Sequence, residues 1–372
     1  MAQVGEKVGV LRGTTVQQIV EHKHRLVEIP YMATVNDALT TLLAKNILAV
    51  PVAAPPGQWI GAGGSMILES DKVTGVVRKQ YIGMVSVLDI LIHIAEAEKE
   101  EDVDSRLKAP VSSIIGHSME GLSLWSISPQ TSVFEAMEPM SKGIHRALIP
   151  VESKMDHTIG VELMEASPGY HIFTQTDMVE FLYMHSKELD FMTNLSVLEL
   201  GAVHPEVYAA PSCMKVMDVV KCMRKTSLQA VAIVESTGDL DNELALVRGN
   251  GRKLVGTFSA SDLLGCTSEM LRAWATLPIL SFFSKAGIAQ RFGMGAAVNA
   301  GPFECRGFQK SPVTCHLQTP LAEVMSKALT SHVHRVWVVD NDGNLNGVVS
   351  FSDMIRVVHD FFSKHNPQAD YQ

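Results

Sequence analysis

Internal repetition is the feature that most restricts how this chain can fold. A unit of helix, strand, turn, strand and helix occurs four times, and an aspartate near the start of its second helix falls at positions 89, 177, 262 and 353. Spacings of 88, 85 and 91 residues are hard to obtain by chance. Each unit is small for a stable core, so we expect the units to pack in pairs, as two halves at about 25–188 and 189–363.

The last copy shows the unit most clearly. Residues 321–333 carry apolar side chains at helical spacing, 335–339 and 345–350 are strands around a five-residue turn, and 352–362 are a second helix. The corresponding turns of the other copies contain 28, 18 and 19 residues, which places these insertions at hairpin tips. A long connector at about 267–310 is either a binding loop or a partly mobile linker.

Composition narrows the classes of function. Hydrophobic residues make up 46% and charged residues 19% of the 372, which is typical of a globular chain. The net charge of −9 argues against a broad nucleic-acid-binding surface. The longest nearly uncharged run, 273–283, is too short to cross a membrane, and no secretory signal is visible. Five cysteines without a CxxC motif indicate reduced thiols. We therefore expect an intracellular protein, in the cytoplasm and with the nucleus as a further compartment.

A short polar segment stands where the second strand of each unit meets its second helix. The four segments are SVLD, TQTD, SASD and SFSD, ending at Asp89, Asp177, Asp262 and Asp353. Helix capping explains each segment taken singly, because its side-chain oxygens accept the first free N–H groups of a helix. The same aspartate in all four copies indicates a second role, since a carboxylate at such a corner can accept both vicinal hydroxyls of a ribose.

Two copies carry a His-Arg pair where the first strand begins. The pairs are His145-Arg146 and His334-Arg335, and in the last copy we expect the pair and the SFSD segment at opposite ends of an apolar hairpin. A solvated pair at a helix end is one explanation. Phosphate recognition is the other, because arginine offers a planar fork for phosphate oxygens and histidine adds a donor. Residues 46–50 and 227–231, the equivalent stretches of the other copies, carry no charge.

These features resemble four cystathionine-β-synthase-type (CBS) repeats, as in the γ regulatory subunits of AMP-activated and sucrose-non-fermenting-related protein kinases. The resemblance covers about residues 30–360; it is most specific at 122–151 and 313–358, and the glycine-rich insertion after Pro55 resembles plant-type members. It implies an α/β fold of strand-helix-strand-strand-helix repeats, paired into two Bateman modules that pack as a disc. The implied boundaries are an N-terminal segment 1–24, repeats at 25–105, 106–188 and 189–270, a connector 271–310, the rest of the fourth repeat 311–363 and a tail 364–372.

The resemblance further implies a non-catalytic subunit that binds AMP, ADP or ATP between repeats and assembles with catalytic (α) and scaffolding (β) kinase subunits. Two departures stand out: Leu88 replaces a usual hydroxyl residue, and Asp177 replaces a residue that is commonly basic. The candidate ribose-binding residues are Asp89, Asp177, Asp262, Asp353, Ser350, Ser352, Ser259, Ser261, Thr174 and Thr176. The candidate phosphate-binding residues are His145, Arg146, His334 and Arg335.

Other functions find weaker support. GAGGSM (61–66) and GMGAAVNAG (293–301) lack the strand-to-helix context and the lysine of phosphate-binding loops, and neither a G-x-S-x-G nor an H-E-x-x-H motif occurs. The pair His332-x-His334 has no evident third ligand for a metal. No cofactor, nucleic acid or membrane partner is expected. A structural adaptor that keeps the four repeats without binding nucleotide stays open, because helix caps would be present in both cases.

Overall fold

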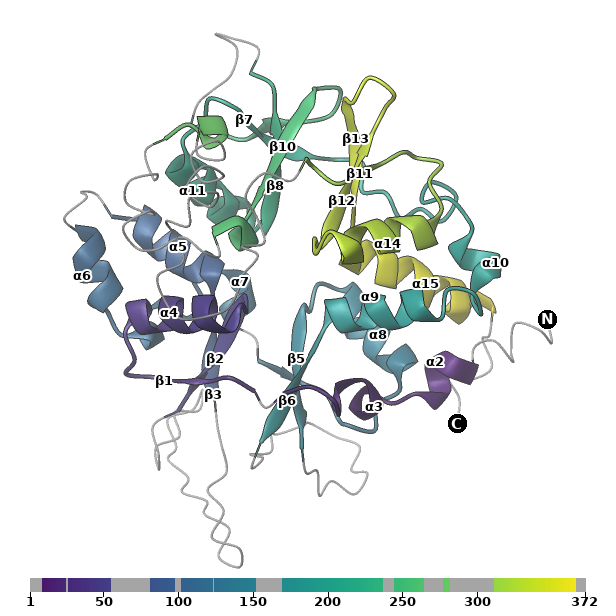
Figure 1. Cartoon of the computed structure of the whole chain (residues 1–372), viewed down its shortest axis with the longest axis horizontal. Coiled ribbons are helices and arrows are strands. Elements are labelled where there is room, and N and C mark those ends of the chain that lie inside the picture. Colours follow the sequence, from purple (N-terminus) through teal and green to yellow (C-terminus); the bar gives the residue numbers. More distant parts are fainter. Residues whose placement is uncertain are drawn as a thin grey trace, which may run out of the picture.

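Four small sheets lie around the centre of the molecule, with helices on two opposite sides (Figure 1). The structure is a computed structural model, and it describes residues 9–24, 26–54, 81–97, 102–122, 124–151, 169–236, 244–263, 277–281 and 311–365. Within them, no helix is both long enough and apolar enough to cross a membrane. The glycine-rich segments, most of the connector, Cys266 and Cys305 lie outside these residues.

Each sheet is built in the same way. A short first strand pairs parallel to the second, and the second pairs antiparallel to the third. The strands are β1 (Ile29–Pro30), β2 (Ala49–Ala53) and β3 (Tyr81–Ser86); β4 (Trp125–Ser126), β5 (Arg146–Pro150) and β6 (Tyr170–Thr174); β7 (Tyr208–Pro211), β8 (Ala230–Val234) and β10 (Leu254–Ser259), with β9 (Val247–Arg248) added beside β7; and β11 (Thr314–Cys315), β12 (Arg335–Val339) and β13 (Leu345–Ser350).

The helices complete the repeats in the predicted order. The first helix of each repeat is α4 (Val35–Lys45), α8 (Val133–Ser141), α11 (Val216–Thr226) or α14 (Leu321–Thr330). The second is α5 (Val87–Ala95), α9 (Gln175–Met184), the short 3-10 turn η2 (Ala260–Leu263) or α15 (Phe351–His365). Connecting elements are α6 (Asp102–Lys108), η1 (Val111–Ile114), α7 (Met119–Leu122) and α10 (Asp190–Thr193). The α/β class and the strand-helix-strand-strand-helix repeat are therefore confirmed.

A left-handed residue follows the first helix of every repeat and reverses the chain into the next strand. The residues are Asn46, Gly143, Ser227 and His332, with φ of 51°, 96°, 55° and 52°, each three positions before its strand. Only one of the four is glycine, although a side chain disfavours this conformation. The shared turn gives all four first strands the same starting geometry.

Hydrophobic contacts join the repeats in two different ways. Sheets of repeats one and two meet through a small cluster at Tyr81, Leu148 and Tyr170, and those of repeats three and four through a cluster that contains Trp337 and Leu345. The two larger clusters join repeat one to repeat three and repeat two to repeat four through their helices. We predicted pairing within each half, and the structure adds the helix contacts that join the halves, because each repeat has a second apolar face to bury.

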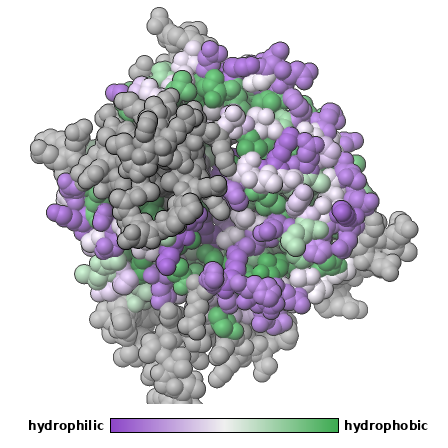
Figure 2. Space-filling view, viewed as in Figure 1, coloured by the Kyte–Doolittle hydropathy of each residue, from purple (hydrophilic) through white to green (hydrophobic). Residues whose placement is uncertain are grey.

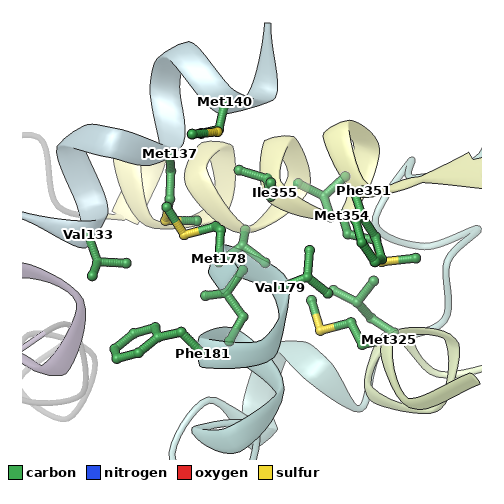
Figure 3. Packing of buried hydrophobic residues seen from close by; sticks show 14 of the residues in the cluster. Val133, Met137, Met140, Met178, Val179, Phe181, Met325, Phe351, Met354 and Ile355 are labelled. Carbon is green, nitrogen blue, oxygen red and sulfur yellow. The ribbon is translucent and has the colours of Figure 1, made fainter. Parts of the chain in front are cut away.

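Methionine fills much of the core shared by repeats two and four. Figure 3 shows Met137, Met178, Met325 and Met354 converging from α8, α9, α14 and α15, and all four side chains are fully buried. The unbranched thioether adapts to irregular gaps between packed helices. This confirms the prediction that methionines on the apolar helix faces, such as Met137 and Met140, are core residues.

The N-terminal segment is part of this same core. Its short helices α2 (Gly9–Gly13) and α3 (Val16–Val20) bury Leu11, Val16 and Val20 against repeats two and four. Thr15 forms a bridge with Ser132, just before the first helix of repeat two. The equivalent bridges in the other repeats are Thr34–Pro110, Lys215–Pro278 and Ser196–Pro320. The segment thus supplies a contact that every repeat needs, a role its sequence did not reveal.

Gly347 allows the chain that connects the two halves to lie directly on β13. A β-carbon at this position would lie 2.5 Å from the Cγ1 atom of Val203 and 2.8 Å from the carbonyl oxygen of His204. Residues His204 and Val348 exchange two backbone hydrogen bonds here, so neither strand can move aside without breaking them.

We therefore expect Gly347→Ala to lower the free energy of unfolding by about 1–3 kcal/mol, the usual cost of overpacking. Gly13→Ala is the matched control, because nothing lies within 4 Å of a β-carbon at Gly13. Urea unfolding followed by circular dichroism measures both variants. Equal midpoints for Gly347→Ala and the parent chain would contradict this account of the contact.

Candidate functional site

The four repeats meet around a central cavity of about 1320 Å³. Each repeat contributes residues from the end of its first helix, the start of its middle strand or its strand-to-helix corner. The N-terminal segment adds a short stretch after α3. Hydrophilic side chains border the hollow near the middle of the face shown in Figure 2. A ligand that filled this cavity would therefore touch all four repeats.

Antiparallel pairing brings the His-Arg pair and the polar corner of a repeat together. Arg335 lies opposite Ser350 in the register of β12 and β13, and the N–H of Phe351 donates to the carbonyl of His334. The register of β5 and β6 is the same at Arg146. The expectation that the two polar segments lie at opposite ends of the hairpin was wrong, because the reversal of the chain makes the two ends neighbours.

All four corner aspartates cap the helix or helical turn that follows. One carboxylate oxygen accepts from the backbone N–H and the hydroxyl of the residue three positions earlier, at 2.6–3.0 Å. The bonded pairs are Ser86–Asp89, Thr174–Asp177, Ser259–Asp262 and Ser350–Asp353. Capping is therefore confirmed at every corner, and binding of ribose stays a prediction that depends on what else surrounds each carboxylate.

Asp262 is the corner aspartate that lines the cavity. Burial raises the pKa of its carboxyl to about 7, although the hydrogen bonds from Ser259 and the positive charge of Arg335 act in the opposite direction. The hydroxyls of Ser259 and Ser261 lie 2.7 Å apart beside it. Asp262 thus offers a carboxylate that faces the cavity and titrates close to neutral pH.

Asp89 is fully buried and does not reach the cavity. Its Oδ2 atom takes part in the cap, and its Oδ1 atom accepts from the backbone N–H of Ser118 at 2.6 Å. Burial raises the pKa of this carboxyl, against the effect of these bonds. Ser86 and Leu88 line the cavity in its place. The structure therefore does not bring Asp89 to the site where we expected it.

Asp177 is paired with a lysine from outside the repeats. The Nζ atom of Lys23 lies 2.6 Å from its Oδ2 atom and also donates to the carbonyl of Ile172 at 3.1 Å. Lys23, Thr174 and Thr176 line the cavity, whereas Asp177 does not. The lysine thus stands between this carboxylate and the cavity.

Asp353 is the fourth corner aspartate, and it too is absent from the lining of the cavity. Its Oδ1 atom lies 3.4 Å from a guanidinium nitrogen of Arg356, one turn along the same helix. Ser350 and Ser352 do line the cavity, and the Ser352 hydroxyl accepts a bond of 2.8 Å from the side-chain amide of Gln175. In this repeat the serines, rather than the aspartate, face the cavity.

The four candidate phosphate-binding residues share this one cavity. His145, Arg146, His334 and Arg335 come from repeats two and four, and all four line it. A guanidinium nitrogen of Arg335 donates to the carbonyl of Ala230 at 3.1 Å, which links repeat four to repeat three. The structure therefore brings together two His-Arg pairs that are separated by nearly 190 residues in sequence.

Four further basic residues line the cavity: Lys23, His24 and Lys45, which sequence reasoning missed, and His332, which we considered only as part of a metal-binding pair. Lys45 is the last residue of α4, one position before the stretch we compared between repeats. Lysine in the last turn of a helix was the available signal. No repeat pattern pointed to Lys23 or His24, which precede the first repeat. With these residues the described lining contains four Lys or Arg, four His and one carboxylate, that of Asp262.

Comparison with known proteins agrees with the fold. The family model for the CBS domain matches residues 307–360. Two Arabidopsis thaliana proteins, the SNF1-related protein kinase regulatory subunits gamma-like PV42b and PV42a, are each 46% identical to the chain. The match to PV42b covers 92% of this chain and 94% of that protein. The match to PV42a covers 93% of this chain and 95% of that protein. A solved structure from Methanocaldococcus jannaschii, described as a candidate archaeal homologue of the γ subunit of AMPK, has a TM-score of 0.59 at 16% identity, covering 93% of this chain and 100% of that one.

Near-half identity over more than nine-tenths of the chain, together with four repeats of one fold, shows that this chain belongs to the family of plant SNF1-related protein kinase γ-like regulatory subunits built from CBS repeats.

Proposed function

We propose that this chain is a non-catalytic regulatory subunit that binds an adenine nucleotide in its central cavity and thereby adjusts a Ser/Thr protein kinase that senses cellular energy. The observation that carries the proposal is the cavity itself, where two His-Arg pairs and Asp262 face one space lined by every repeat. Kinase regulation is the role named for the two Arabidopsis relatives.

The cavity has the chemistry that a nucleotide needs. Arginine and histidine suit phosphate oxygens, and a carboxylate suits ribose hydroxyls. Apolar residues such as Leu48, Ile233 and Trp337 line the same space and would pack against a base. At about 1320 Å³ the cavity exceeds the usual range of roughly 300–1,000 Å³ for one small ligand. It therefore has room for one nucleotide and space beyond it.

Regulation follows from the way the ligand would bridge the repeats. A nucleotide held by Asp262 of repeat three and by arginines of repeats two and four would favour one arrangement of the repeats over others. It shifts the kinase only where its affinity differs between two states of the assembly. The proposed partners are the catalytic (α) and scaffolding (β) subunits, in the cytoplasm with a nuclear pool. The ligand is regulatory, and the described residues include no group of three or more His, Cys, Asp or Glu side chains arranged to hold a metal.

One set of observations favours a second candidate, a structural adaptor that binds no nucleotide. Asp89, Asp177 and Asp353 each have a partner within the chain besides their cap. Three of the four corners are thus stable without a ligand. The adaptor would keep the disc and its partner surfaces, and it would leave the positive charge of the cavity without a function, which is why we place it second.

The ribose role of Asp262 is tested by Asp262→Asn. Losing ionised hydrogen bonds of about 1.5–3 kcal/mol each predicts AMP binding at least about tenfold weaker. Asp37→Asn is the matched control, because Asp37 makes the same capping bonds to Thr34 but does not line the cavity. Isothermal titration calorimetry at one fixed ionic strength measures both. If the two variants bind AMP with similar affinity, Asp262 does not contact the ligand.

The phosphate role of the arginines predicts a change in the dependence on salt. Arg146→Gln and Arg335→Gln should each flatten the fall of AMP affinity with rising salt, because each removes one charge that acts on the ligand. Arg252→Gln is the control, since Arg252 bonds the carbonyl of Glu235 and does not line the cavity. If AMP affinity falls with salt equally steeply in the parent and in all three variants, Arg146 and Arg335 do not contact phosphate directly.

The raised pKa of Asp262 predicts how stability depends on pH. The folded chain holds this proton up to about pH 7, whereas the unfolded chain releases it near the ordinary value of 3.8. The free energy of unfolding therefore falls as the pH rises through this window, by on the order of 4 kcal/mol. Asp262→Asn should remove that loss.

Thermal midpoints of the parent and Asp262→Asn, compared at about pH 5 and about pH 8, measure this effect. The thermal midpoint of the variant, relative to that of the parent, should be higher at about pH 8 than at about pH 5. A difference between the two chains that does not change with pH would show that Asp262 is already ionised throughout the range.

A further inference from the structure

Lys23 occupies one oxygen of the Asp177 carboxylate. That oxygen receives three donors: the ammonium of Lys23 at 2.6 Å, and the N–H and the hydroxyl of Thr174, each at 2.7 Å. The side chain of Lys23 is 31% exposed and that of Asp177 only 12%, so the lysine covers the acid. Lys23 lines the cavity and Asp177 does not, so the ammonium meets the carboxylate on the side that faces the cavity.

The position of Lys23 is set by the N-terminal segment, which packs against repeats two and four. Helix α3 ends three residues earlier, and its Val16 and Val20 are buried in the core of repeats two and four. The N–H of Val16 donates to the carbonyl of Thr131, and the N–H of Lys23 donates to the carbonyl of Val20. These contacts hold the backbone at Lys23, so little conformational entropy is lost when the ammonium pairs with Asp177.

The other corners are not closed in this manner. Asp89 is sealed within the core by a backbone N–H, Asp353 meets an arginine on its own helix, and Asp262 lines the cavity. Only at Asp177, among the four, does a cation from outside the repeats stand between the acid and the cavity. Its corner is otherwise complete, because Thr174 and Thr176 line the cavity beside His145.

We propose that Lys23 is a built-in plug that keeps the second corner from taking a ligand. Its ammonium holds the place of the ribose hydroxyls, and the docked N-terminal segment keeps it there. The inference rests on the proposed function and deepens it, because it assigns one corner as closed and names the residue that closes it. Removing the ammonium would leave a carboxylate already oriented by its cap.

The test is calorimetric titration of the full-length chain with AMP at one ionic strength. Lys23→Met keeps the aliphatic stem and removes the charge. It should bind one more AMP per chain than the parent, and the double variant with Asp177→Asn should lose that extra binding. Lys142→Met is the control, because Lys142 forms a 2.6 Å pair with Glu138 in the same repeat but does not line the cavity.

The outcomes separate this inference from the proposed function. If the parent binds AMP and Lys23→Met binds the same amount, the plug is wrong and the proposed function stands. If only Lys23→Met binds, the plug is supported and nucleotide binding by the unaltered chain is refuted. If neither binds, both fail. Lys23→Gln serves as a second neutral variant if the thermal midpoint shows that Lys23→Met is not folded.

Discussion

The hydrogen bonds between the corner aspartate and the residue three positions before it determine the geometry around the cavity. They fix where each third strand ends and, in most repeats, where a helix begins, and the antiparallel register then places the start of the middle strand beside that corner. Such a cap contributes about 1 kcal/mol to stability. Its larger effect here is on geometry, because the four corners share one structure and each directs side chains toward the central cavity.

The two kinds of packing explain why that centre is shared. Sheets meet within each half and helices meet between the halves, so every repeat touches two others and the four close into a ring. The larger hydrophobic clusters lie between the halves. A half alone would therefore expose a wide apolar face, and the cavity exists only when both are present. A ligand that bridges the repeats in the proposed way would therefore act on the arrangement of the whole ring rather than on one pair of repeats.

The repeats, their order and the His-Arg pairs could be predicted because each depends on local pattern: helical spacing, β-branched strands and aspartates at fixed intervals. The environment of each aspartate could not. Asp89 and Asp177 occupy the same position at the start of the second helix, three residues after a Ser or Thr, yet Ser118 seals one and Lys23 pairs with the other. Both partners lie outside the repeating pattern. Lys45 was missed for a smaller reason, since it precedes by one residue the stretch compared between repeats.

The lining of the cavity is basic although the whole chain carries a net negative charge. The chain carries −9, but the described lining of the cavity holds four Lys or Arg and one carboxylate. Like charges that face one another across a cavity repel, and an anionic ligand relieves that repulsion. Lys23 pairs with Asp177, and burial raises the pKa of Asp262 to about 7, so Asp262 is only partly ionised at neutral pH. The described lining thus carries more basic groups than carboxylates, and this imbalance is the strongest physical argument for the anionic ligand that we propose.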